Sequence, residues 1–305
     1  MSIAVKGTIP CAGCPAAISN PNPTEVTLAN GTTAILLAYD TMNNPSGSKH
    51  GLDRQVWSLD DGISWVDDSL VSYPPNNNVG GLIGPSVGIQ NAKGVIFFSD
   101  SSGQFIYFSR DYGVTWESTL PHPPPGSSEC SIAFLVSPED GRLIQNCRTG
   151  LRKRLQILWS ATLPPVPSTG TYPAGLIDPN CQGSIINQNG TLLLSNSNTT
   201  SGRTHSTVKA STDQGRSWST GVSVWEGPSA CEWVVPVHVP QIGQRIPELL
   251  IHCLLALRYV VDSHCADNAA DSQLVSLDDP KTVGILWEAG MKGAYETISF
   301  KKVVL

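Results

Sequence analysis

The sequence predicts an all-β protein in which residues 1–305 form a single six-bladed β-propeller. An eight-residue pattern, Ser-x-Asp-x-Gly-x-(Ser/Thr)-Trp, occurs over residues 58–65, 109–116 and 211–218. Its Ser positions, with Ser160 as the remnant of another copy, fit a spacing of 51 residues. A fixed period of about 50 residues with one turn in each unit is typical of β-propellers. At this period the chain makes about six blades.

Each octet has the chemistry of a tight turn between two strands of a blade. The Asp side chain can accept hydrogen bonds from the N–H groups of the turn, and the Gly can adopt the positive φ of its corner. We expect the Trp to fold back onto the blade as an apolar plug. The composition fits short strands joined by many loops, because the chain has 28 Gly and 23 Pro but only 14% charged residues.

Charge and composition also restrict the partners. The net charge of −6 argues against nucleic acid or an anionic membrane, and no apolar run approaches the length of a membrane span. The Arg152-Lys153-Arg154 cluster is interpreted as a solvated turn. The six histidines lack the spacing of metal ligands, so neither a metal nor another cofactor is predicted. A small-molecule substrate remains the predicted partner.

Eight cysteines and three Asn-x-Thr sequons, at Asn30, Asn189 and Asn198, suggest passage through an oxidising compartment. We therefore expect a secreted, extracellular glycoprotein with disulfides. The alternative is that the sequons occur by chance and the thiols are simply buried. The chain begins without a charged-then-apolar leader, so a secreted form would have lost its signal peptide.

Apolar runs predict strands at residues 34–39, 94–98 and 105–108. The Pro-rich stretch 121–126 is expected to be a stiff connector within the domain. Near the start, Cys11 and Cys14 form a C-x-x-C pattern. Because neither a second such pair nor a βαβ unit accompanies it, a local disulfide or two separate bridges are expected instead of a zinc or redox site.

The octet is an Asp-box (BNR repeat), and with the segments that follow it the chain resembles the sialidase (neuraminidase) superfamily. Glu129-Cys130 and Asn146-Cys147-Arg148 resemble a strand opening and its hairpin partner in that family, and Arg203 lies eight residues before Ser211. The resemblance implies that Glu129 assists a nucleophile and that Arg148 and Arg203 bind a substrate carboxylate. An arginine suits this task because its planar fork donates two parallel hydrogen bonds. The alternative for Glu129 and Arg148 is a structural pair near the propeller axis.

Three family positions depart from the sialidase pattern. Gly13 occupies the place of the first arginine, and the window of the general-acid Asp contains His50 but no acidic residue. Cys231 occupies the place of the nucleophilic Tyr. Tyr295 resembles the strand that closes the family's propeller and is not predicted to replace that nucleophile. Together these departures argue against ordinary sialidase activity. His50 itself has two interpretations, an exposed loop residue or a displaced general acid.

Cys231 is compatible with two roles, an attacking thiolate or a disulfide with Cys181. The pairing that we expect is one of many possible sets. It joins Cys11 to Cys14, Cys130 to Cys147, Cys181 to Cys231 and Cys253 to Cys265.

Trp225 and Trp233 flank the position of Cys231, so the predicted pocket is polar on its arginine side and apolar on the other. Glu129, Arg148 and Arg203 are the candidate catalytic residues, and His50, Cys231, Trp225 and Trp233 the candidate substrate-binding residues. Such a pocket can orient an apolar molecule and polarise a carbonyl without a nucleophile. The hypothesis is a non-hydrolytic enzyme, specifically a pericyclase (hetero-Diels–Alder type). It draws on a resemblance to reduced sialidase-like proteins of fungal natural-product biosynthesis.

Two alternatives stay open. One is an exo-α-sialidase-like glycoside hydrolase with a displaced acid, Asp40 or His50, acting with Glu129. The other is a glycan-binding lectin, although the residues outside the boxes differ too much between blades to favour repeated sugar sites.

Overall fold

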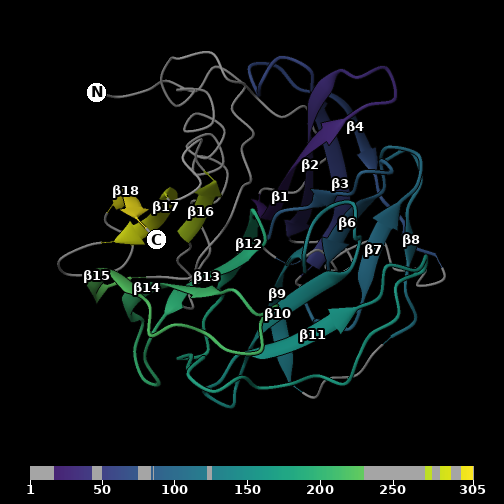
Figure 1. Cartoon of the computed structure of the whole chain (residues 1–305). Helices are drawn as coiled ribbons and strands as arrows, with labels where there is room; N and C mark the ends of the chain where they lie inside the picture. Colours follow the sequence, from purple (N-terminus) through teal and green to yellow (C-terminus); the bar gives the residue numbers. More distant parts are fainter. Residues whose placement is uncertain are drawn as a thin grey trace.

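The computed structural model describes residues 17–42, 50–74, 84, 86–121, 126–229, 272–276, 282–289 and 297–304. Within these ranges the regular structure consists of strands, arranged as five antiparallel sheets (Figure 1). None of the described segments is a helix with the length and apolar character that crossing a bilayer requires. The all-β class is therefore confirmed, whereas a sixth blade and closure of the ring stay predictions.

The five sheets follow the chain. Sheet 1 contains β1 (Ala17–Thr27), β2 (Thr33–Met42), β3 (His50–Ser58) and β4 (Val66–Leu70). Sheet 2 contains β5 (Ile89–Gln90), β6 (Ile96–Ser99), β7 (Ile106–Ser109) and β8 (Glu117–Ser118). Sheet 3 contains β9 (Ser127–Phe134), β10 (Leu143–Thr149) and β11 (Leu155–Trp159). Sheet 4 contains β12 (Ser184–Gln188), β13 (Thr191–Ser197), β14 (Thr204–Ser211) and β15 (Val222–Pro228). Sheet 5 contains β16 (Ser272–Ser276), β17 (Thr282–Ala289) and β18 (Thr297–Val304).

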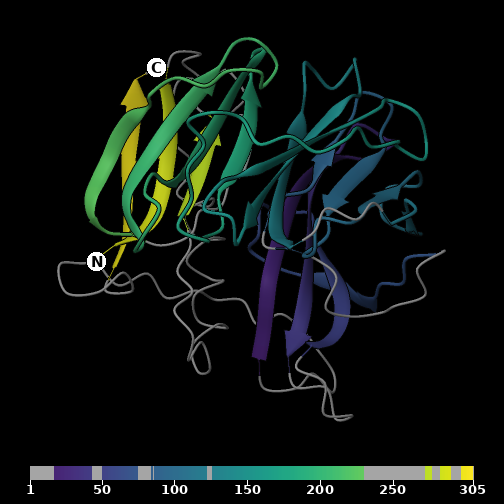
Figure 2. The ribbon, with the colours of Figure 1, turned by 90° about the horizontal axis from the view of Figure 1, so that it is seen from below.

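Each sheet packs against the next through a core of buried apolar side chains. In strands, side chains alternate between the two faces, and here both faces of the inner strands are apolar. Leu36 of sheet 1 and Phe98 of sheet 2, for example, belong to one core cluster, and Ile144 of sheet 3 and Ile185 of sheet 4 belong to another. Figures 1 and 2 show the sheets succeeding one another from sheet 1 in purple to sheet 5 in yellow. The successive cores fix how neighbouring sheets face each other.

The three Asp-box turns have the predicted chemistry. In the first, the Asp60 carboxylate accepts hydrogen bonds from the backbone N–H of Ser64 at 2.8 Å and from its hydroxyl at 2.6 Å. Ser58 Oγ accepts the N–H of Gly62 at 2.7 Å, and Gly62 has a φ of 87°. The same bonds recur in the boxes that begin at Ser109 and Ser211. The short polar side chains thus close each turn locally.

Two of these boxes are each held by a glutamine from the preceding sheet. Gln55 on β3 donates to the Gly113 carbonyl and accepts from the Trp116 indole N–H, both at 2.8 Å. Gln156 on β11 makes the same two bonds at 2.9 Å, to Gly215 and Trp218. The box Trp is therefore a polar link between sheets as well as the predicted apolar plug.

The first hairpins of sheets 1 to 4 lie together at one end of the molecule. Thr27, at the end of β1, donates to the side chain of Gln90 at 2.8 Å, and Ala92 N donates to Pro138 O at 3.3 Å. Asn187, near the end of β12, donates to Phe134 O at 3.0 Å. We call this end the turn face, and it also carries the Asp boxes, which follow the third strands. The opposite end, where β9 begins and β10 ends, is called the site face.

We expect Gln55→Met to destabilise the protein by about 2–4 kcal/mol. The substitution keeps the bulk of the side chain but leaves the buried Trp116 N–H and Gly113 carbonyl unpaired, each at about 1–3 kcal/mol. Equilibrium urea unfolding measures the difference. Gln156→Met should behave alike, and Arg216→Met, at an exposed box position, should have no comparable effect. Equal unfolding midpoints for Gln55→Met and the native chain would contradict this role.

Candidate functional site

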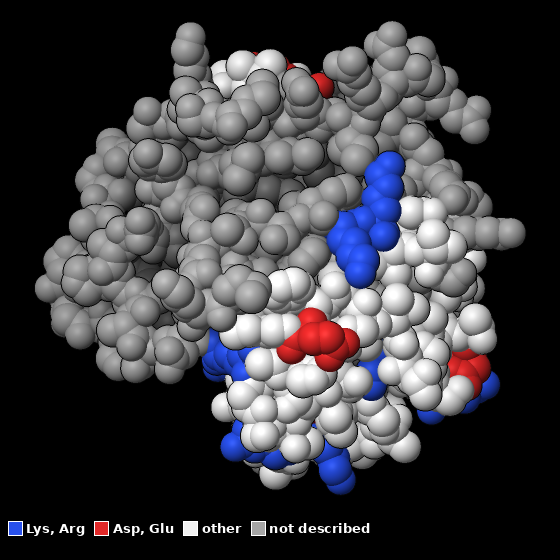
Figure 3. All heavy atoms as spheres, turned by 90° about the vertical axis from the view of Figure 1, so that its left-hand side faces the viewer, with Lys and Arg blue, Asp and Glu red and all other residues white. Residues whose placement is uncertain are grey.

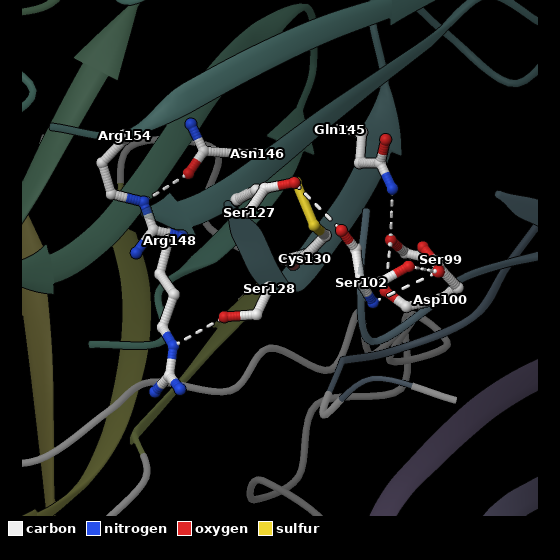
Figure 4. Close-up of a disulfide and its surroundings, with 12 residues drawn as sticks. Ser99, Asp100, Ser102, Ser127, Ser128, Cys130, Gln145, Asn146, Arg148 and Arg154 are labelled. Atoms are coloured by element: carbon white, nitrogen blue, oxygen red, sulfur yellow. Dashed lines mark hydrogen bonds between the residues drawn. A yellow bond between two sulfur atoms is a disulfide. The ribbon is translucent and has the colours of Figure 1, made fainter. Parts of the chain in front are cut away.

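Glu129 and Arg148 meet at the site face, on the neighbouring strands β9 and β10. Arg148 Nη1 lies 2.5 Å from Glu129 Oε2, and Arg148 Nε donates to Ser128 Oγ at 3.0 Å (Figure 4). The two side chains are 23% and 27% exposed. Two of the three candidate catalytic residues therefore form one partly accessible ion pair.

A β-bulge brings Glu129 to this position. Cys147 pairs with Cys130, but Arg148 pairs with Ser128, so Glu129 is the extra residue of β9. Its φ of 45° lies in the left-handed region, which non-glycine residues seldom occupy. A bulge changes the direction in which a side chain leaves its strand, and here the displaced side chain reaches Arg148.

A disulfide and a loop of sheet 2 support the bulge. Cys130 and Cys147, which are bonded as predicted, directly neighbour Glu129 and Arg148. Ser101 O accepts the N–H of Glu129 at 2.6 Å. Gly103 packs so tightly on the disulfide that a Cβ there would lie 2.6 Å from Cys130 Sγ. Figure 4 shows this loop against the sulfur atoms. The ion pair is thus held by covalent and hydrogen bonds from both sheets.

Asp100 shapes that loop from within. Its buried carboxylate accepts the N–H groups of Ser102 at 3.1 Å and Phe105 at 3.2 Å, and also the Ser102 hydroxyl. Burial raises the pKa of Asp100 to about 6, although these hydrogen bonds act in the opposite direction. The side chain serves its own loop, so it is assigned no direct part in chemistry.

Arg154 corrects one prediction. Arg152 and Lys153 are exposed as expected, but Arg154 is completely buried. Its Nε donates to Asn146 Oδ1 at 2.6 Å, and its Nη1 donates to Asp178 Oδ2 at 2.5 Å and to Cys181 O at 2.7 Å. Arg154 is buried because the chain turns at Arg152, where φ is 60°. The residues that follow therefore lead back into the protein interior.

Glycine is required where Arg154 meets the segment that leads into β12. A Cβ on Gly183 would lie 2.8 Å from the Arg154 guanidinium carbon. Because three hydrogen bonds hold that guanidinium, it has little freedom to move away. Arg154 thereby joins β10 and β11 of sheet 3 to the entry of sheet 4.

Arg203 is the third predicted catalytic residue, and it precedes β14. It is half-buried, and its Nη1 has no solvent contact and, among the described residues, no hydrogen-bond partner. Its backbone carbonyl accepts Ser229 N at 2.9 Å, which ties it to the end of β15. Burial raises the pKa of Glu129, and the positive charges of Arg148, Arg203 and Arg154 oppose this rise. Glu129 therefore lies within electrostatic reach of three guanidinium groups.

Further buried polar atoms near the site face have no hydrogen-bond partner within the described ranges. They include one nitrogen each of Asn146 and Arg154 and the hydroxyls of four buried serines, Ser184, Ser195, Ser197 and Ser229. Buried polar groups are normally paired with protein or water. This part of the molecule therefore has donors and acceptors ready for water or a ligand.

The predicted substrate-binding residues make no hydrogen bond or ion pair to Glu129 in the described part of the chain. Trp225 on β15 is half-buried, and its indole N–H donates to Pro228 O at 3.1 Å. Residues 223–228 line one wall of a pocket of about 600 Å³.

His50 is the first residue of β3, paired with Met42, which places it at the site-face end of sheet 1. Cys231 and Trp233 lie outside the described residues.

The other sequence predictions have mixed outcomes. Cys181 is in a disulfide, but its partner lies outside the described residues, as do the expected Cys11–Cys14 and Cys253–Cys265 pairs and Tyr295. Asp40 is fully buried opposite the equally buried Asp53. In the described ranges, no group of three or more His, Cys, Asp or Glu could hold a metal ion.

Charged side chains do not form one large patch on the side of the molecule drawn in Figure 3. Among its coloured atoms, basic and acidic groups occur in separate small clusters.

We expect Asp178→Asn to lower the free energy of unfolding by about 3–5 kcal/mol, because it leaves the buried charge of Arg154 without a counter-ion. Urea unfolding again measures the change. Combining Asp178→Asn with Arg154→Met should recover part of the loss, since the double variant buries no charge. If the two single changes were merely additive, the two side chains would not be coupled.

Comparison with known proteins agrees with this architecture. The chain is similar in fold to the Hadza microbial sialidase Hz136, with a TM-score of 0.62 and 20% identity over 94% of this chain and 52% of the other. For the intramolecular trans-sialidase from Ruminococcus gnavus the TM-score is 0.61 with 15% identity, over 94% and 78%. For the Aleuria aurantia lectin it is 0.51 with 10% identity, over 95% and 77%. The chain spans about half the length of Hz136. Residues 15–279 match the BNR repeat-like domain, and the chain belongs to this family, with a sialidase-like fold.

Proposed function

We propose that the protein is an enzyme that binds an apolar small molecule at the site face and promotes its cyclisation without a nucleophile. The observation that carries the proposal is the pairing of Glu129. Its carboxylate is bound to Arg148 at 2.5 Å, whereas one buried N–H group of Arg203 has no partner in the part of the chain that the structure describes. The site thus supplies hydrogen-bond donors more readily than a base.

The unpaired donor favours a ligand with an oxygen acceptor. A buried polar group without a partner costs about 1–3 kcal/mol, and a ligand oxygen that accepts the Arg203 N–H removes this cost. Glu129 holds Arg148 in a fixed orientation, so its guanidinium can act with that of Arg203. Trp225 and the pocket at β15 supply apolar surface for the rest of the molecule.

A hetero-Diels–Alder cycloaddition is the specific reaction that we propose for this pocket. In that reaction an oxygen-containing diene and an alkene form one C–C and one C–O bond together, three π bonds become one, and no atom leaves. Hydrogen bonds to the diene's carbonyl oxygen withdraw electron density and make it more reactive toward the alkene. Holding the two partners in contact contributes the remaining acceleration. Neither a cofactor nor a nucleophile is needed.

A sialidase-like hydrolysis is the second candidate. It is favoured by the proximity of Glu129, Arg148 and Arg203, the three inherited positions, and by a fold that known sialidases share. Against it stand the absence of an acidic residue from the predicted general-acid window and the burial of Asp40.

A fluorogenic sialoside separates the two candidates. We expect no release of 4-methylumbelliferone from 4-methylumbelliferyl N-acetylneuraminic acid above the buffer rate, because the proposed chemistry has no step that cleaves a glycosidic bond. The variants are Glu129→Gln and, as a control, Glu117→Gln, whose glutamate forms an exposed pair with Arg110. Turnover that survives in Glu117→Gln but disappears in Glu129→Gln would establish the hydrolase instead. Saturable sugar binding without product would favour a lectin.

Binding of the aromatic sulfonate 8-anilinonaphthalene-1-sulfonate tests the pocket itself. The probe combines an anionic oxygen group with an apolar body, so Arg203→Met should weaken its binding about tenfold or more. Arg110→Met, on the surface, should bind the probe like the native chain. Fluorescence titration gives both dissociation constants, and equal values for the two variants would contradict the assignment of Arg203.

The same titration should depend on pH. Burial raises the pKa of Glu129 above its ordinary value, so lowering the pH from neutral through this pKa protonates the carboxyl and releases Arg148. We expect the anionic probe to bind more tightly as the pH falls, and Glu129→Gln to lack this part of the dependence. His205 Nε2 lies 3.2 Å from Glu226 Oε2, and His205→Asn is measured in parallel as a control. A slope unchanged in Glu129→Gln would contradict the proposal.

A further inference from the structure

Two of the three sequons occupy equivalent positions in different sheets. Asn30 lies in the turn between β1 and β2, and Asn189 in the turn between β12 and β13. These are the first hairpins of sheets 1 and 4, and both belong to the turn face. Asn198 follows β13, at the opposite end of the same sheet.

The turn at Asn30 is open to solvent and leaves its amide nitrogen unused. Asn30 is exposed, and its Oδ1 accepts the N–H of Thr32, the sequon threonine, at 2.9 Å. No hydrogen bond in the described part of the chain involves its Nδ2. A Cβ built on the adjacent Gly31 meets nothing within 4 Å. There is room for a large group at this point.

The turn at Asn189 has the same openness. Gln188 pairs with Thr191, so Asn189 and Gly190 form a two-residue turn, with φ values of 52° and 85°. This is the Asn-Gly pattern of tight hairpins. Asn189 is exposed, and Gly190, like Gly31, has open space around its Cβ position.

Asn198 differs although its sequence motif is equally good. It is half-buried, and its Oδ1 has no solvent contact. Its backbone N–H donates to His205 O at 2.9 Å, which holds it beside the segment that carries Arg203. Its amide group is thus partly packed against the protein near the site face, which leaves less room for a sugar than at Asn30 or Asn189.

We propose that Asn30 and Asn189 carry N-linked glycans and that Asn198 does not. A bond forms between the asparagine Nδ2 and the anomeric carbon of the first sugar of a lipid-linked oligosaccharide. The bond from that carbon to the pyrophosphate oxygen breaks, the lipid pyrophosphate leaves, and the amide loses one proton. Both glycans project from the turn face, so the site face with Glu129 and Arg148 stays open.

The turn face also has surface that a glycan would shield. The Asp-box turns there expose apolar side chains: Leu59 and Ile63 are each 61% exposed, and Val114 is 79% exposed. Bulky polar sugars on the same face would reduce contact between these side chains of different molecules. The inference is independent of the proposed cyclisation.

The test secretes the full chain from yeast behind a heterologous signal peptide and measures glycan occupancy by intact mass and peptide mapping, before and after removal of N-glycans. The native chain should carry two glycans. Asn30→Asp and Asn189→Asp should each lose one, and the matched Asn198→Asp should lose none. Aspartate suits the test because it keeps the oxygen acceptor at residue 30 and tolerates the positive φ at residue 189.

Two further measurements keep the test decisive. Thr32→Val and Thr191→Val remove the sequons without changing either asparagine, so they replace an aspartate variant that fails to fold. The double variant Asn30→Asp/Asn189→Asp should bind 8-anilinonaphthalene-1-sulfonate as the native chain does. A glycan on Asn198, or an unmodified Asn30 or Asn189 in the secreted protein, would overturn the proposal.

Discussion

The hydrogen bonds and the ion pair of the buried Arg154 guanidinium hold sheet 3 and the entry of sheet 4 together. This guanidinium binds Asn146 on β10, the Asp178 carboxylate and the Cys181 carbonyl, and it lies against Gly183 just before β12. One side chain thus connects two strands of sheet 3 with the entry of sheet 4. A charge in such a place is tolerated because a carboxylate and neutral acceptors surround it.

The candidate site is built on this junction by contacts between sheets. Sheet 3 supplies Glu129 and Arg148 on a bulge beside a disulfide, and sheet 2 holds the backbone of Glu129 through Ser101. Arg203 comes from the start of β14 in sheet 4. A site at the meeting point of three sheets is rigid where they touch, which suits the orientation of a substrate better than a site on one free loop.

The local features of this protein could be predicted from the sequence, and the long-range ones could not. The Asp-box turns and the Cys130–Cys147 pair follow from residues close together in sequence. The acceptor of the Trp116 indole is Gln55, which is 61 residues away, and no pattern within the box indicates it. The prediction for Arg154 is wrong because three adjacent basic residues resemble a solvated turn, whereas its partner Asp178 is 24 residues further on. The sequence places Glu129 and Arg148 on neighbouring strands, but no pattern in it indicates the bulge that brings their side chains together.

We propose that the carboxylate of Glu129 orients Arg148 and does not serve hydrolysis. A crystal structure of the protein soaked with a transition-state analogue of sialic acid tests this role. We expect Glu129 to stay bound to Arg148 and no sugar density to appear between Arg148 and Arg203. Density for the analogue with its carboxylate held by both arginines, and an acidic side chain within reach of the glycosidic oxygen, would contradict it.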